Sequence, residues 1–146
     1  MKYSCEVIID KPIAEVIEKF DRSDMSTWQP GFVSMELISG QEKAEGSKYV
    51  LKYKMKKREM ELTETIVKFD LPREFTAIYE SGKVWNENQN LFSEVDGKTK
   101  YISNNEFRLG GFMKFFGWIM PGMFKKQTLS YMNNFKRWVE TGETIK

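Results

Sequence analysis

The amino-acid types available for chemistry in this chain are limited, because its 146 residues include no histidine. Ser-His-Asp and Cys-His triads, a histidine general base and every histidine-ligated metal site are therefore excluded. The single cysteine, Cys5, lies in an alternating apolar pattern, where a small buried core residue is expected. Acid–base chemistry would fall to Asp, Glu, Lys or Tyr. No metal or nucleotide motif is present, so we expect no metal, nucleotide or other cofactor.

Glu64 is the only candidate catalytic residue, and a weak one. It lies in a predicted strand over 59–69. The apolar residues Met60 and Leu62 mark one face early in this strand, whereas Val67 and Phe69 mark the opposite face later. A β-bulge near Glu64 and Thr65 would reconcile the two halves and bend the sheet. An inward Glu64 in an apolar cavity would have a raised pKa and could serve as a general acid or base. Thr63 or Thr65 could equally be the residue that faces inward.

A larger group of polar side chains is positioned by a hairpin turn. The Asp-Gly pair at 96–97 favours a two-residue turn between strands 84–95 and 98–109. The resulting register sets Glu87 opposite Glu106, and opposed glutamates are better tolerated on a face in contact with water. The other, inner face then carries three aromatic residues around a polar cluster: Phe92, Tyr101 and Phe107 around Asn86, Asn88, Asn90, Ser103 and Asn105.

Buried amides need hydrogen-bond partners, because leaving them unpaired is costly. Water, neighbouring side chains or a ligand could supply these partners. A register shifted by one residue would instead leave the asparagines in water. In the inward arrangement the cluster fits the polar part of a small-molecule cavity. Aromatic residues would form the rest of its wall: Tyr49, Tyr53, Tyr79, Tyr101, Phe107, Phe124 and Tyr131.

A long amphipathic helix over 122–140 is the element on which the sheet would close. At 100° per residue, its apolar side chains occupy one arc, with Pro121 suited to its first turn and Gly142 placed where it ends. Two short helices, near 10–21 and 24–28, would follow a first strand over 3–9. We therefore predict one α+β domain over residues 1–146, with a curved antiparallel sheet of about seven strands wrapped on the C-terminal helix.

Several short stretches of the sequence resemble motifs of the START-like superfamily, also labelled SRPBCC or polyketide cyclase/dehydrase and lipid transport. Residues 10–20 (DKPIAEVIEKF) and 27–35 (TWQPGFVSM) look like the opening helix and the Trp-x-Pro-Gly approach to strand two. Residues 68–75 (KFDLPREF) are similar to a family turn, with Leu71 in place of the first proline. Residues 110–140 resemble the closing helix, with Phe135 at a leucine position. These motifs are signatures of a fold, and none is catalytic.

The resemblance implies a helix-grip fold that holds an apolar small molecule between sheet and helix. It would place Trp28 near the cavity mouth, although a packing role is equally compatible. The function predicted first is binding or carriage of a lipid, polyketide or isoprenoid-like molecule. The alternatives are a cyclase or hydrolase acting on such a ligand, and an interaction module that uses the Phe112–Phe124 surface.

The remaining features bear on partners and location. The net charge is +2 with interleaved signs, so no nucleic-acid partner is expected, and the basic run at 52–58 fits a solvated turn. The apolar stretch Phe112–Phe124 could be a cavity wall, a lid or dimer contact, or a peripheral membrane patch. A monomer or a homodimer is expected. The N-terminal residues do not form the apolar run of a signal peptide, and the predicted location is the cytoplasm.

Overall fold

The computed structural model describes residues 1–21, 24–111 and 121–145. The order of helices and strands is the one that the sequence predicts, except that a short 3-10 helix (η1) stands in place of the second short helix. In chain order the elements are β1 (Lys2–Ile9), α1 (Ile13–Asp21), η1 (Met25–Thr27), β2 (Phe32–Ser39), β3 (Lys48–Met55), β4 (Arg58–Asp70), β5 (Glu74–Ser81), β6 (Val84–Val95), β7 (Lys98–Leu109) and α3 (Pro121–Thr141).

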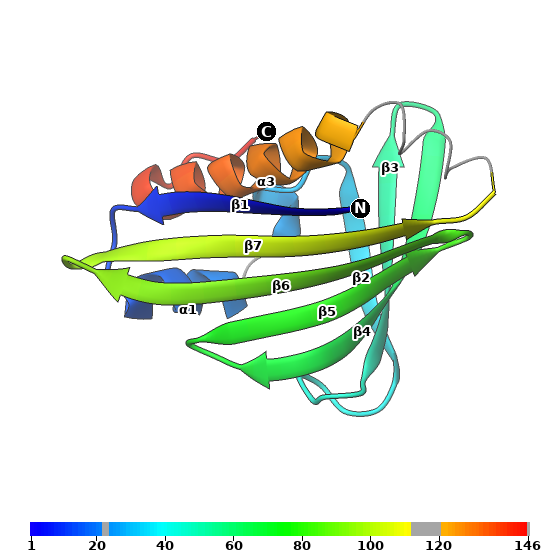
Figure 1. The fold of residues 1–146 in the computed structure, drawn as a ribbon, viewed down its shortest axis with the longest axis horizontal. Helices are drawn as coiled ribbons and strands as arrows, with labels where there is room; N and C mark the ends of the chain where they lie inside the picture. Colours follow the sequence, from blue (N-terminus) through cyan, green and yellow to red (C-terminus); the bar gives the residue numbers. More distant parts are fainter. Residues whose placement is uncertain (22–23, 112–120, 146) are drawn as a thin grey trace.

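The seven strands form one antiparallel sheet in the order β1-β7-β6-β5-β4-β3-β2. The sheet curves strongly, so that β2 and β3 run across the direction of β1 and β7 (Figure 1). Helix α3 lies alongside β1, and α1 lies near the end of the sheet where β6 turns into β7 (Figure 1). The predicted α+β helix-grip architecture is confirmed.

Side chains on β1 and α3 fasten the helix to the edge of the sheet. The Tyr3 hydroxyl contacts the Phe124 carbonyl oxygen at 3.1 Å and the Thr128 hydroxyl at 2.7 Å. Further along, the Lys136 ammonium donates to the Ile8 carbonyl at 2.6 Å. Because these contacts are spread along both elements, the position of α3 over the sheet is fixed. The helix ends at Thr141, and the next residue, Gly142, forms a left-handed cap through its positive φ and its N–H bond to the Trp138 carbonyl.

The core lies where α1 and α3 meet the concave face of the sheet. Phe20 of α1 packs edge-on against Phe92, Tyr101 and Phe135, with ring centroids 5.0, 6.3 and 5.8 Å away. Cys5 is buried in the same cluster, as predicted from its alternating strand pattern. One face of each amphipathic helix is therefore used to close the concave side of the sheet.

The predicted register of the β6–β7 hairpin is confirmed. Val95 pairs with Lys98 across the Asp-Gly turn, and Asn88 lies opposite Asn105. Glu87 faces Glu106 on the convex side. The register continues into β5 as predicted, with Tyr79 and Ala77 paired to Asn86 and Asn88. The asparagines therefore lie on the inner face.

The predicted position of the β4 bulge is wrong by two residues. The pairing with β5 shifts between Ile66 and Lys68, so that the exposed Val67 is the extra residue. Up to Ile66 the even-numbered side chains face inward, and after the bulge Phe69 does. Glu64 therefore faces inward ahead of the bulge, while its neighbours Thr63 and Thr65 face outward.

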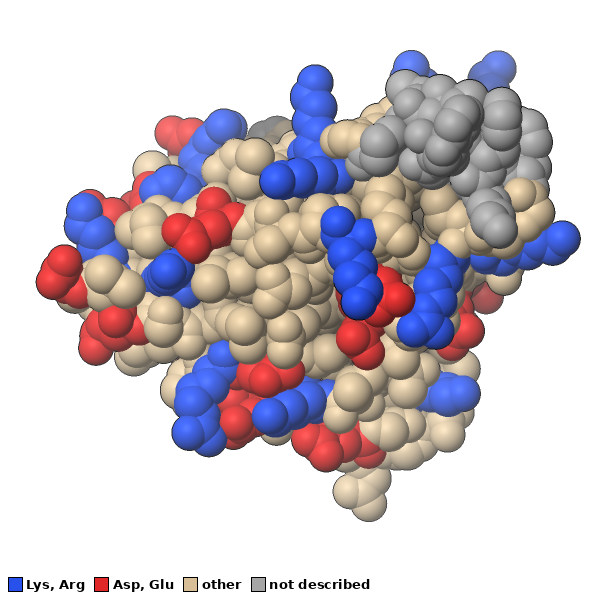
Figure 2. Space-filling view, viewed as in Figure 1, with Lys and Arg blue, Asp and Glu red and all other residues tan. Residues whose placement is uncertain are grey.

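The charged surface matches the expectation of interleaved signs. Acidic and basic side chains are interspersed over the face seen in Figure 2. The basic run at 52–58 forms the β3–β4 hairpin, where Lys52 and Lys54 pair across the strands with Glu61 and Glu59. In the part of the chain that the structure describes, no helix is long and apolar enough to cross a membrane. Residues 112–120, most of the predicted interaction surface, lie outside the described residues.

Candidate functional site

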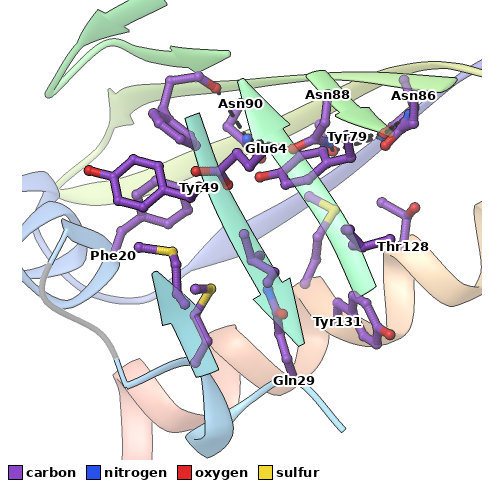
Figure 3. A pocket seen from close by; sticks show the side chains of 18 of the residues that line it. Phe20, Gln29, Tyr49, Glu64, Tyr79, Asn86, Asn88, Asn90, Thr128 and Tyr131 are labelled. Carbon is purple, nitrogen blue, oxygen red and sulfur yellow. Dashed lines mark hydrogen bonds between the residues drawn. The ribbon is translucent and has the colours of Figure 1, made fainter. Parts of the chain in front are cut away.

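A cavity of about 420 Å³ lies between the concave face of the sheet and α3. This volume falls within the range of about 300–1,000 Å³ that is typical of small-molecule sites. Its polar side chains come mainly from β4 to β7, and its apolar wall includes residues of α1, η1, β3 and α3 (Figure 3). Every residue that the sequence predicted as a ligand contact lines this cavity, and so does Glu64. Their contact with a ligand stays a prediction.

The asparagine network forms the polar wall of the cavity and consists of Asn86, Asn88, Asn90, Ser103 and Asn105. The Asn90 amide donates to the Asn88 side-chain oxygen at 2.7 Å. The Asn88 amide then donates to the Ser103 hydroxyl and to the Asn105 side-chain oxygen, each at 2.9 Å. Asn86 reaches the same Asn105 oxygen at 3.2 Å (Figure 3). Neighbouring side chains therefore supply many of the hydrogen bonds that these buried amides require.

Tyr101 joins this network to the aromatic core. Its hydroxyl, fully inside the protein, donates to the Asn90 side-chain oxygen at 2.6 Å. Its ring stacks on Phe92 at a centroid distance of 4.6 Å. Burial raises the pKa of Tyr101, so that this phenol stays a hydrogen-bond donor. Tyr101 therefore anchors the asparagine network to the aromatic core.

Glu64 projects into the cavity from β4, between Tyr49 of β3 and Tyr79 of β5, its cross-strand partners (Figure 3). It is only 5% exposed. Burial raises the pKa of its carboxyl group above the ordinary value of 4.5, against the opposing effect of a hydrogen bond with the Tyr79 hydroxyl. Burial and the nearby carboxyl also raise the pKa of Tyr79. Both groups therefore favour their protonated, uncharged forms.

Replacement of Glu64 by glutamine is expected to change how stability depends on pH. The folded-state pKa of Glu64 is raised, so the unfolded chain ionises first as the pH rises above 4.5. The wild type should therefore lose free energy of unfolding relative to Glu64→Gln as the pH rises from 4.5 towards the folded-state pKa. Denaturant titrations at a series of pH values measure this difference. The exposed Glu61→Gln on the same strand is the control, and a pH-independent difference for Glu64→Gln would contradict the assignment.

The cavity has further wall residues that the sequence did not single out as site residues. The Gln29 side-chain oxygen accepts a hydrogen bond of 2.5 Å from the Tyr53 hydroxyl. Asp21 and Lys43 form an ion pair at 3.0 Å, between the end of α1 and the loop after β2. Met35 and Met60 line the cavity while remaining about half exposed to solvent. These residues come from segments far apart in the chain, and no local pattern in the sequence indicates that they meet.

Comparison with known proteins finds matches only among solved structures. No protein-family model and no curated protein matches the sequence. The structure superposes on Ara h 8.0201 with a TM-score of 0.77 and 13% identity, covering 95% of this chain and 97% of that one. A conserved protein from Geobacillus kaustophilus gives a TM-score of 0.77 and 17% identity, with 95% of each chain covered.

An enzyme is also among the similar structures. A point mutant of norcoclaurine synthase from Thalictrum flavum, in complex with a transition-state analogue, gives a TM-score of 0.69 and 11% identity. This match covers 95% of this chain and 93% of the synthase. Identities this low establish the fold and leave the activity open. With its seven-stranded sheet closed on a long C-terminal helix, the chain has the helix-grip fold of the START-like superfamily that its sequence motifs resemble.

Proposed function

We propose that this protein binds or carries an apolar small molecule of the lipid, polyketide or isoprenoid kind. The observation that carries the proposal is the cavity itself, with its aromatic and aliphatic wall and its ordered asparagine network on one side. Burial of the ligand's apolar surface would supply most of the affinity, and the polar side chains would orient it. The site would work in the cytoplasm, in line with the single cysteine and its free thiol.

Native mass spectrometry of freshly purified protein tests this proposal directly. We expect a stoichiometric mass above that of the chain, and organic extraction should release a molecule of the same mass. An apolar fluorescent dye should compete for the cavity. A clean apo mass together with failure of the dye to bind would overturn the proposal.

A cavity-filling substitution gives the matching prediction. Leu62 lines the cavity from β4, so Leu62→Trp should place an indole in the space where the ligand would lie. If a ligand must be packed against this indole at the usual overpacking cost of about 1–3 kcal/mol, its affinity falls by a factor of about 5 to 150. Glu61→Trp, on the exposed face of the same strand, should retain wild-type binding. Equal dye affinity for the two variants would show that the dye binds elsewhere.

A second candidate function is supported by the inward position of Glu64. A protonated carboxyl group inside an apolar cavity could act as general acid in a cyclisation or hydrolysis of the bound molecule. Incubation of the extracted ligand class with fresh protein distinguishes the two functions. A carrier returns the molecule unchanged. A hydrolase adds water, and a cyclase gives a cyclised isomer or loses water, so chromatography with mass detection reveals either product, and Glu64→Gln should abolish its formation.

A further inference from the structure

Within the part of the chain that the structure describes, the cavity contains a carboxyl group, that of Glu64, without a partner cation. Among the described residues that line it, the only acidic or basic side chains are Asp21, Lys43 and Glu64. Asp21 and Lys43 pair with each other at 3.0 Å. No described lysine or arginine is therefore left in the cavity wall to neutralise an ionised Glu64.

Apart from the Asp21–Lys43 pair, the other titratable side chains in the described cavity wall are phenols from four elements. Tyr49 and Tyr53 come from β3, Tyr79 from β5, Tyr101 from β7 and Tyr131 from α3. Burial raises the pKa values of Tyr53, Tyr79 and Tyr131, so these three groups carry no charge near neutral pH. A carboxylate buried among neutral groups is costly, and the un-ionised acid is the favoured state. With a donor from Tyr79 at one oxygen, the acid proton remains available for a ligand.

Among the described side chains, Trp28 carries a second unpaired donor, buried beside the cavity. Its side chain lines the cavity and is 8% exposed, and its indole Nε1 has no hydrogen-bond partner within the described structure. Trp28 is packed edge-on against Phe135 at 5.2 Å, which fixes its ring. An indole N–H can only donate, so this buried group would be satisfied by an acceptor atom.

One donor, the un-ionised acid of Glu64, thus faces a cavity with no unpaired cation in its described wall. A ligand anion would lack a countercharge, and a ligand cation would require Glu64 to ionise. An uncharged acceptor oxygen satisfies the Glu64 donor without either cost. We propose that the cavity selects an uncharged, apolar molecule bearing a carbonyl or ether oxygen, and that Glu64 positions this oxygen by donating a hydrogen bond. This inference rests on the proposed binding function and specifies its ligand class.

Fluorescence titration with a matched set of probes tests this inference. The ketone probe is 6-propionyl-2-dimethylaminonaphthalene, the reference is 2-dimethylaminonaphthalene, which lacks the carbonyl group, and the cationic probe is a naphthyl-trimethylammonium ion. The readout is the ratio of the dissociation constants of reference and ketone, so that general damage to the cavity cancels. The variants are Glu64→Leu, which removes the donor, Glu64→Gln, which keeps an N–H donor, and Glu61→Leu as the exposed control.

We expect the affinity ratio to favour the ketone in the wild type and to fall about tenfold in Glu64→Leu, the usual cost of one neutral hydrogen bond. Glu64→Gln and Glu61→Leu should keep the ratio. Raising the pH should lower it in the wild type and leave it unchanged in Glu64→Gln. An unchanged ratio in Glu64→Leu, or preferred binding of the cation, would overturn this inference while the binding function stands. Failure of all three probes to bind would overturn the binding function and the inference with it.

Discussion

Replacement of Phe135 by alanine is expected to lower the free energy of unfolding by about 3–5 kcal/mol. Phe135 is fully buried on α3, and its ring lies 5.8, 5.2 and 6.1 Å from those of Phe20, Trp28 and Tyr101. Truncation to alanine leaves a void that the close-packed neighbours cannot collapse to fill, so the cavity cost adds to the lost transfer free energy. Urea denaturation followed by circular dichroism measures the change.

Arg137→Ala is the matched control, because Arg137 is exposed on the same helix two residues further on. Its effect should stay within about 0.5 kcal/mol, as for ordinary surface substitutions. The neighbouring rings of Phe20, Trp28 and Tyr101 also line the cavity, so the milder Phe135→Leu should loosen the ligand site in a protein that still folds. A loss below about 1 kcal/mol for Phe135→Ala would contradict the packing described for α3.

The hairpin is the part of the site that could be predicted from sequence. The Asp-Gly turn sets the register, and the opposed pair Glu87 and Glu106 shows which face is the wet one. Because side chains alternate strictly along a strand, these two observations together place every asparagine of the network. The helix was predictable for a similar reason: its apolar arc repeats with the helical period between a proline and a glycine.

Other parts of the site are decided by long-range packing. The polar run around Glu64 allows a bulge at several positions, and the pairing with β5 is what puts it at Val67. Because the bulge follows Glu64, this residue stays on the inward face together with Leu62. The Asp21–Lys43 ion pair joins a helix end to a distant loop, so it depends on the curvature of the whole sheet. Sequence patterns report the periodicity of a short window of residues, so they do not predict a contact between residues far apart in the chain.

The asparagine network gives the second large expected effect. Asn90→Leu removes three hydrogen bonds, to the Tyr101 hydroxyl, the Asn88 side chain and the Phe75 carbonyl. Each buried group left unpaired costs about 1–3 kcal/mol, partly offset by the apolar leucine, so we expect a net loss of about 3 kcal/mol in stability. Denaturant unfolding measures it, and Ser93→Leu, exposed on the outer face of the same strand, is the control.

A double-mutant cycle separates the lost hydrogen bonds from a poor fit of leucine. Tyr101→Phe removes the hydroxyl that Asn90→Leu would strand, so the double variant should be more stable than the sum of the single changes predicts, by about 1 kcal/mol or more. Strictly additive effects would show that the Tyr101–Asn90 bond contributes nothing to stability. The same variants report on function, because the network forms the polar wall of the cavity. Asn90→Leu should therefore also weaken retention of the bound molecule, whereas Ser93→Leu should leave it unchanged.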